Sequence, residues 1–486
     1  MKSRISRRQF LSASAVAGAG IVLGDALNPR ALAATRTSSL PPTGAGAPFD
    51  HVVICMMENR SFDHFLGWLP GANGTQSGLS FVDTAGVRYP TYNLAPDYEG
   101  CGYADPDHSW SGGLTQLDGG RMDGFLKTAV PGDTFPIGYY TPDTINVLGT
   151  LVQAFGTSDN YFCSILAATY PNRFYQHSAQ TDRDSTVASP TSTLPAIWDQ
   201  LVPATAGSAV TGRYYSTDLP FLALWGSKYA QYIFGFDQFL ADCQTGTLPN
   251  VAFVDPEFVA ESQGFARDDH PHADVRAGEF FMYTVYNAVR QSPLWDRTVL
   301  IFNYDEWGGF FDHVPPPHVV DDKPLASNPQ LDTTRLGFRV PLAVVSPLVP
   351  TGTLISGGAP FEHTSALRLI EWRFGLSPLA ARDANARNLA EFLDLQNPPR
   401  TDTVAVPVPA TAVSTLCGPG NSTPDPPAAI VPEFPWTPGL TVGGAAVAAG
   451  WVAKEMRTRR VARHSFEGAA GDDEQAAVEV TASTGR

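Results

Sequence analysis

Two short runs of the sequence place a carboxylate beside another oxygen-bearing side chain. Glu58 and Asn59 follow one apolar run, and Asp305 and Glu306 follow another. Two adjacent acids at the end of a buried strand repel each other unless a proton or a cation relieves the repulsion. Carboxylate and amide oxygens are the ligands that hard divalent cations prefer. The two pairs together therefore predict a metal site.

A hydroxyl and several histidines are the candidates for nucleophilic and acid–base chemistry. Thr169 precedes Tyr-Pro-Asn-Arg, and its hydroxyl would become a nucleophile if a base or a metal ion stabilised its alkoxide. The alternative is an ordinary turn residue ahead of the proline. His108 lies in an acidic segment, and His270 and His272 form a His-Pro-His run. The intervening proline should point these two imidazoles in different directions, which disfavours joint metal binding.

These side chains need a rigid scaffold, and the apolar pattern predicts one. Strands buried on both faces are predicted at 52–57, 250–254, 298–303 and 340–346. Helices are predicted at 277–291 and 364–374. Alternating buried strands and helices indicate an α/β fold with a mostly parallel sheet, in which ligands gather beyond the carboxyl ends of the strands. The loop-rich segments 68–145 and 176–222 are interpreted as insertions that shape a substrate site.

The composition describes a large folded body with an acidic surface. Of the 486 residues, 43% are apolar and 16% are charged, so the bulk of the chain has enough apolar surface to fold. The formal net charge of −16 opposes binding to nucleic acid, which we exclude as a partner. The five cysteines show no C-x-x-C spacing and predict neither a zinc site nor a disulfide framework. Their odd number leaves at least one unpaired, and a single pair such as Cys101–Cys163 is one option.

The first 33 residues have the pattern of a twin-arginine (Tat) signal peptide. Ser6-Arg-Arg-Gln-Phe-Leu11 matches the twin-arginine consensus, and Ala31-Leu-Ala33 is a small-residue cleavage site. The weakly apolar stretch 12–23 is too short to span a bilayer. We therefore expect residues 1–33 to direct export by the Tat machinery, to the periplasm, the cell envelope or the medium.

The composition changes again near the C-terminus. Residues 396–440 are rich in proline and predict an extended segment, and residues 441–486 predict a helix followed by an acidic, disordered tail. The helix ends in a basic patch, which would suit peripheral contact with a membrane. The alternative, which we favour, is an ordinary surface helix.

Six motifs resemble those of the bacterial phosphoesterase family and occur in the same order. They are HVVICMMENRSFD at 51–63, DHSW at 107–110, MDGF at 122–125, TYPNR at 169–173, YDEWGGFFDH at 304–313 and HTS at 363–365. The family includes Tat-exported phospholipases C and bacterial acid phosphatases. The resemblance implies an alkaline-phosphatase-like α/β/α sandwich with loop-rich insertions, a phosphoesterase catalytic domain over residues 34–395, and one divalent metal ion of unidentified kind.

The resemblance also implies roles for individual residues. The positions that resemble the metal ligands of the family are Glu58, Asn59, Thr169, Asp305 and Glu306. Thr169 also resembles its hydroxyl nucleophile, and His108 and His270 resemble the histidines that face the phosphoryl and leaving groups. His313 and His363 are expected to bind the substrate. Trp307 stands where the family commonly has histidine, so no role carries over to it.

The function expected from these features is exported, metal-dependent hydrolysis of a phosphoric ester. The leading interpretation is a phospholipase C that cleaves a glycerophospholipid to diacylglycerol and a phosphorylated head group, through a phosphothreonine intermediate at Thr169. An acid phosphatase acting on small phosphate monoesters would share the same nucleophile and metal ligands, so it stays open as the alternative. A non-catalytic cell-envelope binding protein is a third hypothesis, which the intact set of candidate residues disfavours.

Overall fold

The computed structural model describes residues 40–203, 209–258, 265–410 and 412. The expected Tat signal (1–33) and the expected C-terminal helix and tail (441–486) lie outside the described residues, as does most of the proline-rich segment 396–440. Among the residues that are described, no helix combines the length and the apolar character needed to cross a membrane.

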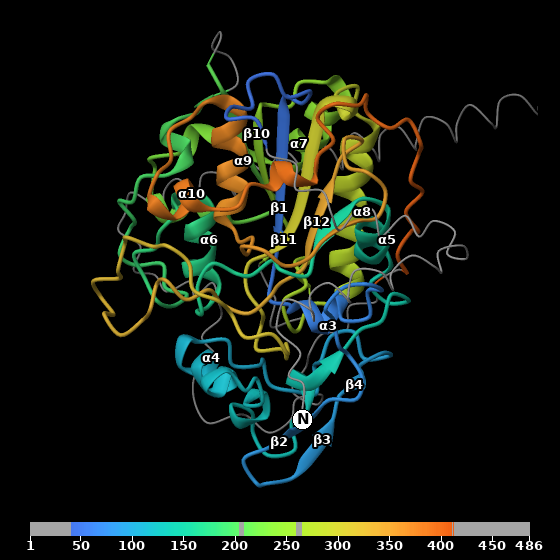
Figure 1. Ribbon diagram of the computed structural model, residues 1–486, viewed down its shortest axis with the longest axis vertical. Helices are drawn as coiled ribbons and strands as arrows, with labels where there is room; N and C mark the ends of the chain where they lie inside the picture. Colours follow the sequence, from blue (N-terminus) through green and yellow to red (C-terminus); the bar gives the residue numbers. More distant parts are fainter. Residues whose placement is uncertain (1–39, 204–208, 259–264, 411, 413–486) are drawn as a thin grey trace, which may run out of the picture. The chain divides into compact units, whose positions relative to one another are not determined.

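A nine-stranded sheet forms the centre of the described chain (Figure 1). Its strands are β1 (His51–Met57), β6 (Gly156–Ser158), β7 (Val202–Pro203), β8 (Thr211–Ser216), β9 (Ile233–Gly235), β10 (Val251–Asp255), β11 (Thr298–Tyr304), β12 (Leu342–Val345) and β13 (Thr353–Ile355). Their spatial order is β13-β6-β12-β11-β1-β10-β8-β7, and β9 also pairs with β8. The neighbouring strands of this sheet are parallel, except where β12 pairs with β11 and β6.

The direction of β12 is the exception within the mostly parallel sheet, and it has a simple cause. The sheet is mostly parallel, as predicted, but β12 runs antiparallel to β11. The chain leaves β11 at the carboxyl edge of the parallel strands, and residues 305–341 contain no helix that would carry it back to the opposite edge. Because a parallel connection needs such a crossover, the chain enters β12 from the edge at which it left β11.

The expected insertion over 176–222 is wrong in part, because it contains β7 and β8 of the central sheet. β8 has the sequence TGRYYS, which lacks the aliphatic run used to recognise buried strands. Its polar groups are satisfied by a neighbouring helix: Arg213 forms an ion pair with Asp242, and the Tyr215 hydroxyl donates to the same carboxylate at 2.6 Å. A strand with internal polar partners gives no apolar signal in the sequence.

Helices cover both faces of the sheet. One layer contains α6 (Thr169–Ser178), α9 (Thr364–Phe374) and α10 (Ala381–Asn385), and the other contains α5 (Asn146–Ala154), α7 (Phe236–Thr245) and α8 (Val275–Gln291) (Figure 1). The predicted helices 277–291 and 364–374 correspond to α8 and α9. The architecture is therefore a three-layer α/β/α sandwich.

The segment 68–145 forms a smaller layer below the carboxyl edge of the sheet, beyond α3 (Phe62–Leu66) (Figure 1). It contains β2 (Ser80–Val82), β3 (Arg88–Pro90), β4 (Tyr92–Asn93), α4 (Trp110–Leu117) and β5 (Gly138–Tyr139). This insertion brings loop residues over the edge at which the candidate side chains lie.

Short 3₁₀ helices occur both inside and outside this insertion. They lie at Asp118–Gly120, Phe125–Lys127, Phe135–Ile137, Ile197–Asp199, Phe221–Trp225, Ala230–Tyr232, Trp295–Arg297 and Leu389–Phe392.

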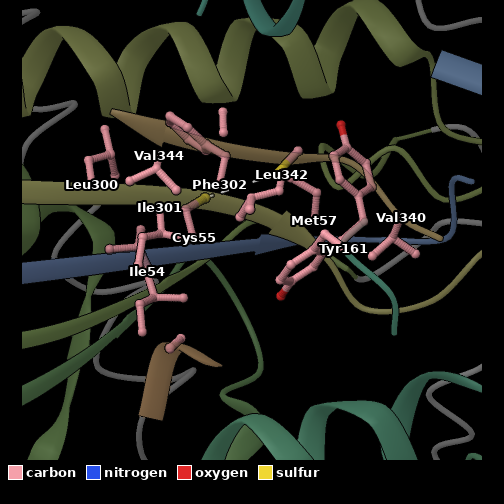
Figure 2. Packing of buried hydrophobic residues seen from close by; sticks show 14 of the residues in the cluster. Ile54, Cys55, Met57, Tyr161, Leu300, Ile301, Phe302, Val340, Leu342 and Val344 are labelled. Atoms are coloured by element: carbon pink, nitrogen blue, oxygen red, sulfur yellow. Dashed lines mark hydrogen bonds between the residues drawn. The ribbon is translucent and has the colours of Figure 1, made fainter. Parts of the chain in front are cut away.

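The middle of the sheet is apolar on both faces. Figure 2 shows Ile54 of β1, Ile301 of β11 and Val344 of β12 packed together, and each is at most 1% exposed. Burial of apolar surface stabilises a fold by about 25 cal/mol per Å². Continuous burial of β1 and β11 explains why both read as unbroken apolar runs, and it makes the sheet a rigid support for its edge.

The register of β1 and β11 aligns the ends of the two strands. The pairs run from His51 opposite Thr298 to Met57 opposite Tyr304. The two strands therefore end at the same level, and the backbone N–H of Asp305 donates to the carbonyl of Met57 at 3.1 Å. The carboxylates that follow each strand consequently leave the sheet side by side.

Candidate active site

Glu58 and Asn59 begin the site at the end of β1. The backbone N–H of Glu58 donates to the Asp268 carbonyl at 2.8 Å, which directs the chain away from the sheet. Asn59 has a positive φ of 59°, a conformation that asparagine tolerates better than most residues. Gly308 packs against this turn, since a Cβ at 308 would lie 2.1 Å from the Asn59 carbonyl oxygen. The glycine in the motif is thus required by a close approach of two backbones.

Asp305 and Glu306 leave β11 beside this turn and are held by backbone N–H groups. The Oδ1 atom of Asp305 accepts from the N–H of Asn59 at 3.0 Å and from that of Glu306 at 2.7 Å. Glu306 Oε2 accepts from the N–H of Gly308 at 2.7 Å. Both carboxyl groups are fully buried. The structure therefore brings together the two acid-bearing runs that the sequence separates by almost 250 residues.

Thr169 is the first residue of α6 and lies next to the same turn. Its Oγ1 is 3.4 Å from Oδ1 of Asn59, and the residue is buried. The side chain of Asn172 holds the approach to the helix, because it bonds to the backbone of Ile165, Ala167 and Ala168. A helix N-terminus favours negative charge on a nearby oxygen. Thr169 is therefore placed where an alkoxide or a phosphate would be stabilised.

Arg173 connects these elements through ion pairs that the sequence analysis did not predict. Its guanidinium contacts the carboxylates of Glu58 at 2.6 Å, Asp255 at 3.3 Å and Asp305 at 3.7 Å. Burial opposes the charge of Arg173, but these carboxylates outweigh it and raise the pKa of Arg173. Asp255 ends β10 just as Glu58 follows β1, so the same rule about strand ends would have found it.

The residues at this edge fit a divalent cation. Three buried carboxylates (Glu58, Asp255 and Asp305) contact one guanidinium, and the buried Glu306 follows Asp305, so the acids outnumber the arginine. Burial raises the pKa of Asp255 to about 6, against the effect of Arg173, so this carboxyl group is close to neutralisation by a proton. A cation bound among these oxygens would relieve the repulsion that otherwise raises such pKa values.

His108 and His270 lie together, as expected for two groups that act on one substrate. Their ring centroids are 5.9 Å apart, and ligand atoms of both lie within 4.8 Å of a carboxylate oxygen of Asp105. Nδ1 of His108 bonds to the Pro106 carbonyl at 2.7 Å, and Nδ1 of His270 bonds to the carbonyl of Pro271. A carbonyl only accepts, so each Nδ1 carries a proton, and Nε2 is the ring nitrogen that acid–base or metal chemistry would use.

The other histidine of the His-Pro-His run points elsewhere. The ring of His272 stacks on Phe135 at a centroid distance of 6.4 Å, whereas His270 faces His108. The expected divergence of the two imidazoles is therefore present. Trp307 is also structural: it is fully buried, and its indole N–H donates to Gln116 at 2.7 Å.

His363 is placed to hold Asp305 instead of a substrate, contrary to expectation. It is fully buried at the start of α9, with Nε2 2.6 Å from the Asp305 carbonyl and Nδ1 2.9 Å from the Tyr161 hydroxyl. Burial lowers the pKa of His363 to about 4, so the ring is neutral near pH 7. Both ring nitrogens are then occupied, which leaves none for a ligand.

His313 belongs to a separate ion-pair network. Its Nδ1 lies 2.5 Å from Asp63, and its Nε2 lies 3.1 Å from Asn73. Asp63, Asp312 and His313 are spaced closely enough to hold a metal ion. However, the fully buried guanidinium of Arg339 donates to both carboxylates and already offsets part of their charge. The structure therefore ties His313 into this network and not into the group around Glu58.

Among the described cysteines, Cys55, Cys163 and Cys243 are buried and free. The option of a Cys101–Cys163 disulfide is therefore wrong. Burial raises the pKa of both the Cys55 and the Cys163 thiols, so these side chains act as small apolar groups.

The sequence model of the Phosphoesterase family matches residues 49–213 and 197–377, a span that contains every residue of the site described above. The chain belongs to this family, which makes it a phosphoester hydrolase.

Two relatives show how far the similarity extends. Phospholipase C B of Mycobacterium tuberculosis is 30% identical over 467 residues, covering 81% of this chain and 87% of that protein. Non-specific phospholipase C6 of Arabidopsis thaliana is 32% identical over 398 residues, covering 73% and 74% respectively. A solved structure of an alkaline phosphatase superfamily protein from Vibrio parahaemolyticus aligns with 10% identity and a TM-score of 0.32 over 74% of this chain and 76% of its own, a similarity too low to argue from.

We expect His313→Gln to make stability less dependent on pH. The hydrogen bond to Asp63 raises the pKa of His313 above its ordinary value of 6.5, so the ion pair stabilises the fold at low pH. This contribution is lost as pH rises through the folded-state pKa, so Tm should differ more between wild type and variant at about pH 5.5 than at about pH 8.5. Calorimetry measures both. The control His318→Gln changes an exposed histidine and should alter Tm little. If the Tm of wild type and of His313→Gln differ by the same amount at both pH values, the ion pair is contradicted.

Proposed function

We propose that this chain is a metal-dependent phospholipase C that hydrolyses a glycerophospholipid to diacylglycerol and a phosphorylated head group. Family membership and the names of its relatives support this class of reaction. The observation that carries the proposal is the Thr169 hydroxyl, 3.4 Å from Asn59 at the N-terminus of α6 and beside a buried acidic cluster. That arrangement suits a nucleophile that attacks phosphorus.

The cation would be held by Glu58, Asn59, Thr169, Asp305 and Glu306. When bound, it supplies positive charge that stabilises the Thr169 alkoxide and the phosphoryl oxygens. Helix α6 adds the partial positive charge of its N-terminus at the same point. Arg173 keeps two of the carboxylates in place, because it contacts Glu58 and Asp305.

The reaction would proceed in two displacements. Thr169 Oγ1, its proton having passed to solvent, attacks phosphorus, and the bond from phosphorus to the diacylglycerol oxygen breaks as a phosphothreonine forms; the same oxygen leaves deprotonated in the second displacement. His108, when protonated at Nε2, gives that proton to the departing oxygen. A water molecule then attacks phosphorus, His270 Nε2 takes a proton from it, and the Thr169 oxygen leaves. Both histidines have this nitrogen directed away from their own backbone hydrogen bonds.

An acid phosphatase remains the alternative because it would use the same nucleophile. Hydrolysis of p-nitrophenylphosphorylcholine and of phosphatidylcholine vesicles tests the proposal against hydrolysis of p-nitrophenyl phosphate. Preference for the diesters supports a phospholipase C, and preference for the monoester supports the phosphatase. No turnover of any of them, with divalent metal supplied, would favour a non-catalytic binding protein.

We further propose that the enzyme is exported by the Tat pathway and meets its lipid substrate outside the cytoplasm. The support is the twin-arginine motif and the cleavage site in the first 33 residues. Peripheral contact with a membrane is part of this proposal, because a phospholipase C must reach lipid at an interface.

Thr169→Ala should lower kcat at least ~10³-fold, because it removes the attacking oxygen of a catalytic unit. Thr169→Ser keeps a hydroxyl and should retain measurable activity. Steady-state assays on the preferred substrate and trapping of a phosphorylated peptide that contains residue 169 check both expectations. Wild-type turnover by the alanine variant would rule out Thr169 as the nucleophile.

Removal of metal should lower Tm and abolish activity, and Asp305→Asn should reduce the effect of chelation. The variant removes the charge of one ligand. Its amide nitrogen would take the place of Asp305 Oδ2, which now lies 3.7 Å from Nε of Arg173. Metal content and melting curves with and without EDTA measure both changes. Asp242→Asn alters a buried acid of the distant pair with Arg213 and serves as the control. Full metal occupancy in Asp305→Asn would exclude Asp305 as a ligand.

Replacement of Arg7 and Arg8 by lysine should stop export and leave folded, active enzyme in the cytoplasm, since the Tat pathway reads the arginine pair and not charge alone. Fractionation of expressing cells followed by activity assays in each fraction measures the outcome. Normal export of the double-lysine variant would show that the signal has been misassigned.

A further inference from the structure

The segment that carries His270 contains a residue in an unusual conformation. Asp269 has a φ of +80°, which residues with a side chain rarely adopt. The residue is fully buried. Conformations of this kind persist only where surrounding contacts impose them, and they concentrate at functional sites.

Two neighbours enclose the Asp269 carboxylate. The hydroxyl of Tyr304 donates to Oδ2 at 2.6 Å. On the other side lies the backbone of α8 at Gly278, where an added Cβ would come within 1.9 Å of Oδ1. Any side chain at position 278 would therefore displace Asp269. The glycine at this position creates the space that the carboxylate occupies.

The backbone around Asp269 is bonded to the segment that follows β1 and carries Glu58. The Asp268 carbonyl accepts the N–H of Glu58 at 2.8 Å, and the Asp269 carbonyl accepts Nε of Arg60 at 2.7 Å. The N–H of His270 donates to the Asp268 side chain at 3.0 Å. A displacement of Asp269 would therefore move both the backbone of His270 and the hydrogen bond that holds Glu58.

We propose that Asp269 is a positioning residue that sets the placement of His270 and Glu58. Its carboxylate is held between the Tyr304 hydroxyl and the α8 backbone at Gly278, and this contact fixes the backbone of residues 268–270. The inference rests on the proposed function, because it assigns Asp269 a role in that same reaction. Misplacement of a catalytic group by about 1 Å can cost on the order of 10²-fold in rate, so a small shift is measurable.

The test is Gly278→Ala, which pushes on Asp269 from a helix that contributes no reacting group. We expect kcat to fall at least ~10-fold with KM within about 2-fold, since chemistry and not binding is disturbed. The Tm should fall by a few degrees, because the clash with buried Asp269 costs more than the helix preference of alanine returns, so kcat is compared well below the Tm of the variant. As a readout apart from activity, the imidazole NMR signals of His270 should shift while those of His313 stay in place.

Gly149→Ala is the matched control for adding a methyl group to a helix. Its Cβ would lie 3.3 Å from the nearest atom of Trp68, a contact that a small adjustment relieves. This variant should keep wild-type kcat. A double-mutant cycle gives the sharper test: in the background of Asp269→Gly the clash is gone, so Gly278→Ala should then lower kcat less than about 2-fold.

Tyr304→Phe provides a second route if Gly278→Ala does not fold. It removes only the hydroxyl that holds Asp269 and should lower kcat at least ~3-fold with KM unchanged. Tyr232→Phe, which removes a buried hydroxyl bonded to the Leu201 carbonyl at 2.6 Å, should keep wild-type kcat.

The outcomes separate this inference from the function on which it rests. An active wild type with full kcat in Gly278→Ala and in Tyr304→Phe would overturn the role of Asp269 and leave the hydrolase intact. If Gly278→Ala lowers kcat equally in the wild type and in the Asp269→Gly background, the role of Asp269 is also overturned, because the effect then arises elsewhere in α8. A wild type inactive on every phosphoester would remove the proposed function and this inference with it.

Discussion

The rest of the site depends on one guanidinium among carboxylates. Arg173 lies four residues after Thr169, so the two share one face of α6. By contacting Glu58, Asp255 and Asp305, it ties that helix to the ends of three neighbouring strands. A buried ion pair adds little net stability, but its geometry is demanding, and loss of one partner is costly. The arginine therefore serves mainly to fix where the threonine hydroxyl lies relative to the acids.

The same constraint explains why the site needs so many backbone contacts. Carboxylates this close together would move apart unless each were held, and N–H groups hold Asp305 and Glu306. Glycine at 308 allows the two turns that supply these groups to touch. His363 holds the Asp305 carbonyl from the far side. Each contact restricts the acids, so their repulsion is stored in the fold and is available to bind positive charge.

The parts of the fold that the sequence predicts are those in which apolar burial is continuous. β1, β10 and β11 are recognisable because a continuous apolar run makes up most of each strand, and α8 and α9 lie at the predicted places. The acids next to β1 and β11 were found because strand ends are where ligands gather. The family motifs added the roles of Thr169 and the histidines.

The parts that it does not predict depend on partners distant in the chain. β8 is polar because Asp242 satisfies it, and the direction of β12 follows from the absence of a crossover helix. His363 appears in a motif, yet its role follows from contacts with Tyr161 and Asp305 that no local pattern contains. Asp269 is likewise inconspicuous in the sequence, because the space for its carboxylate is set by Gly278 of helix α8.

The aligned ends of β1 and β11 also govern which changes in chain length the protein tolerates. Side chains along a strand alternate between faces, so a one-residue deletion inside β1 would turn every later side chain to the opposite face. Glu58 would then leave the sheet on the opposite face from Asp305. In the present structure seven matched pairs between β1 and β11 bring the two residues to the same place. Substitutions among apolar residues in this strand preserve that phase, whereas insertions and deletions do not. The length of β1 is therefore more tightly constrained than the identity of its residues.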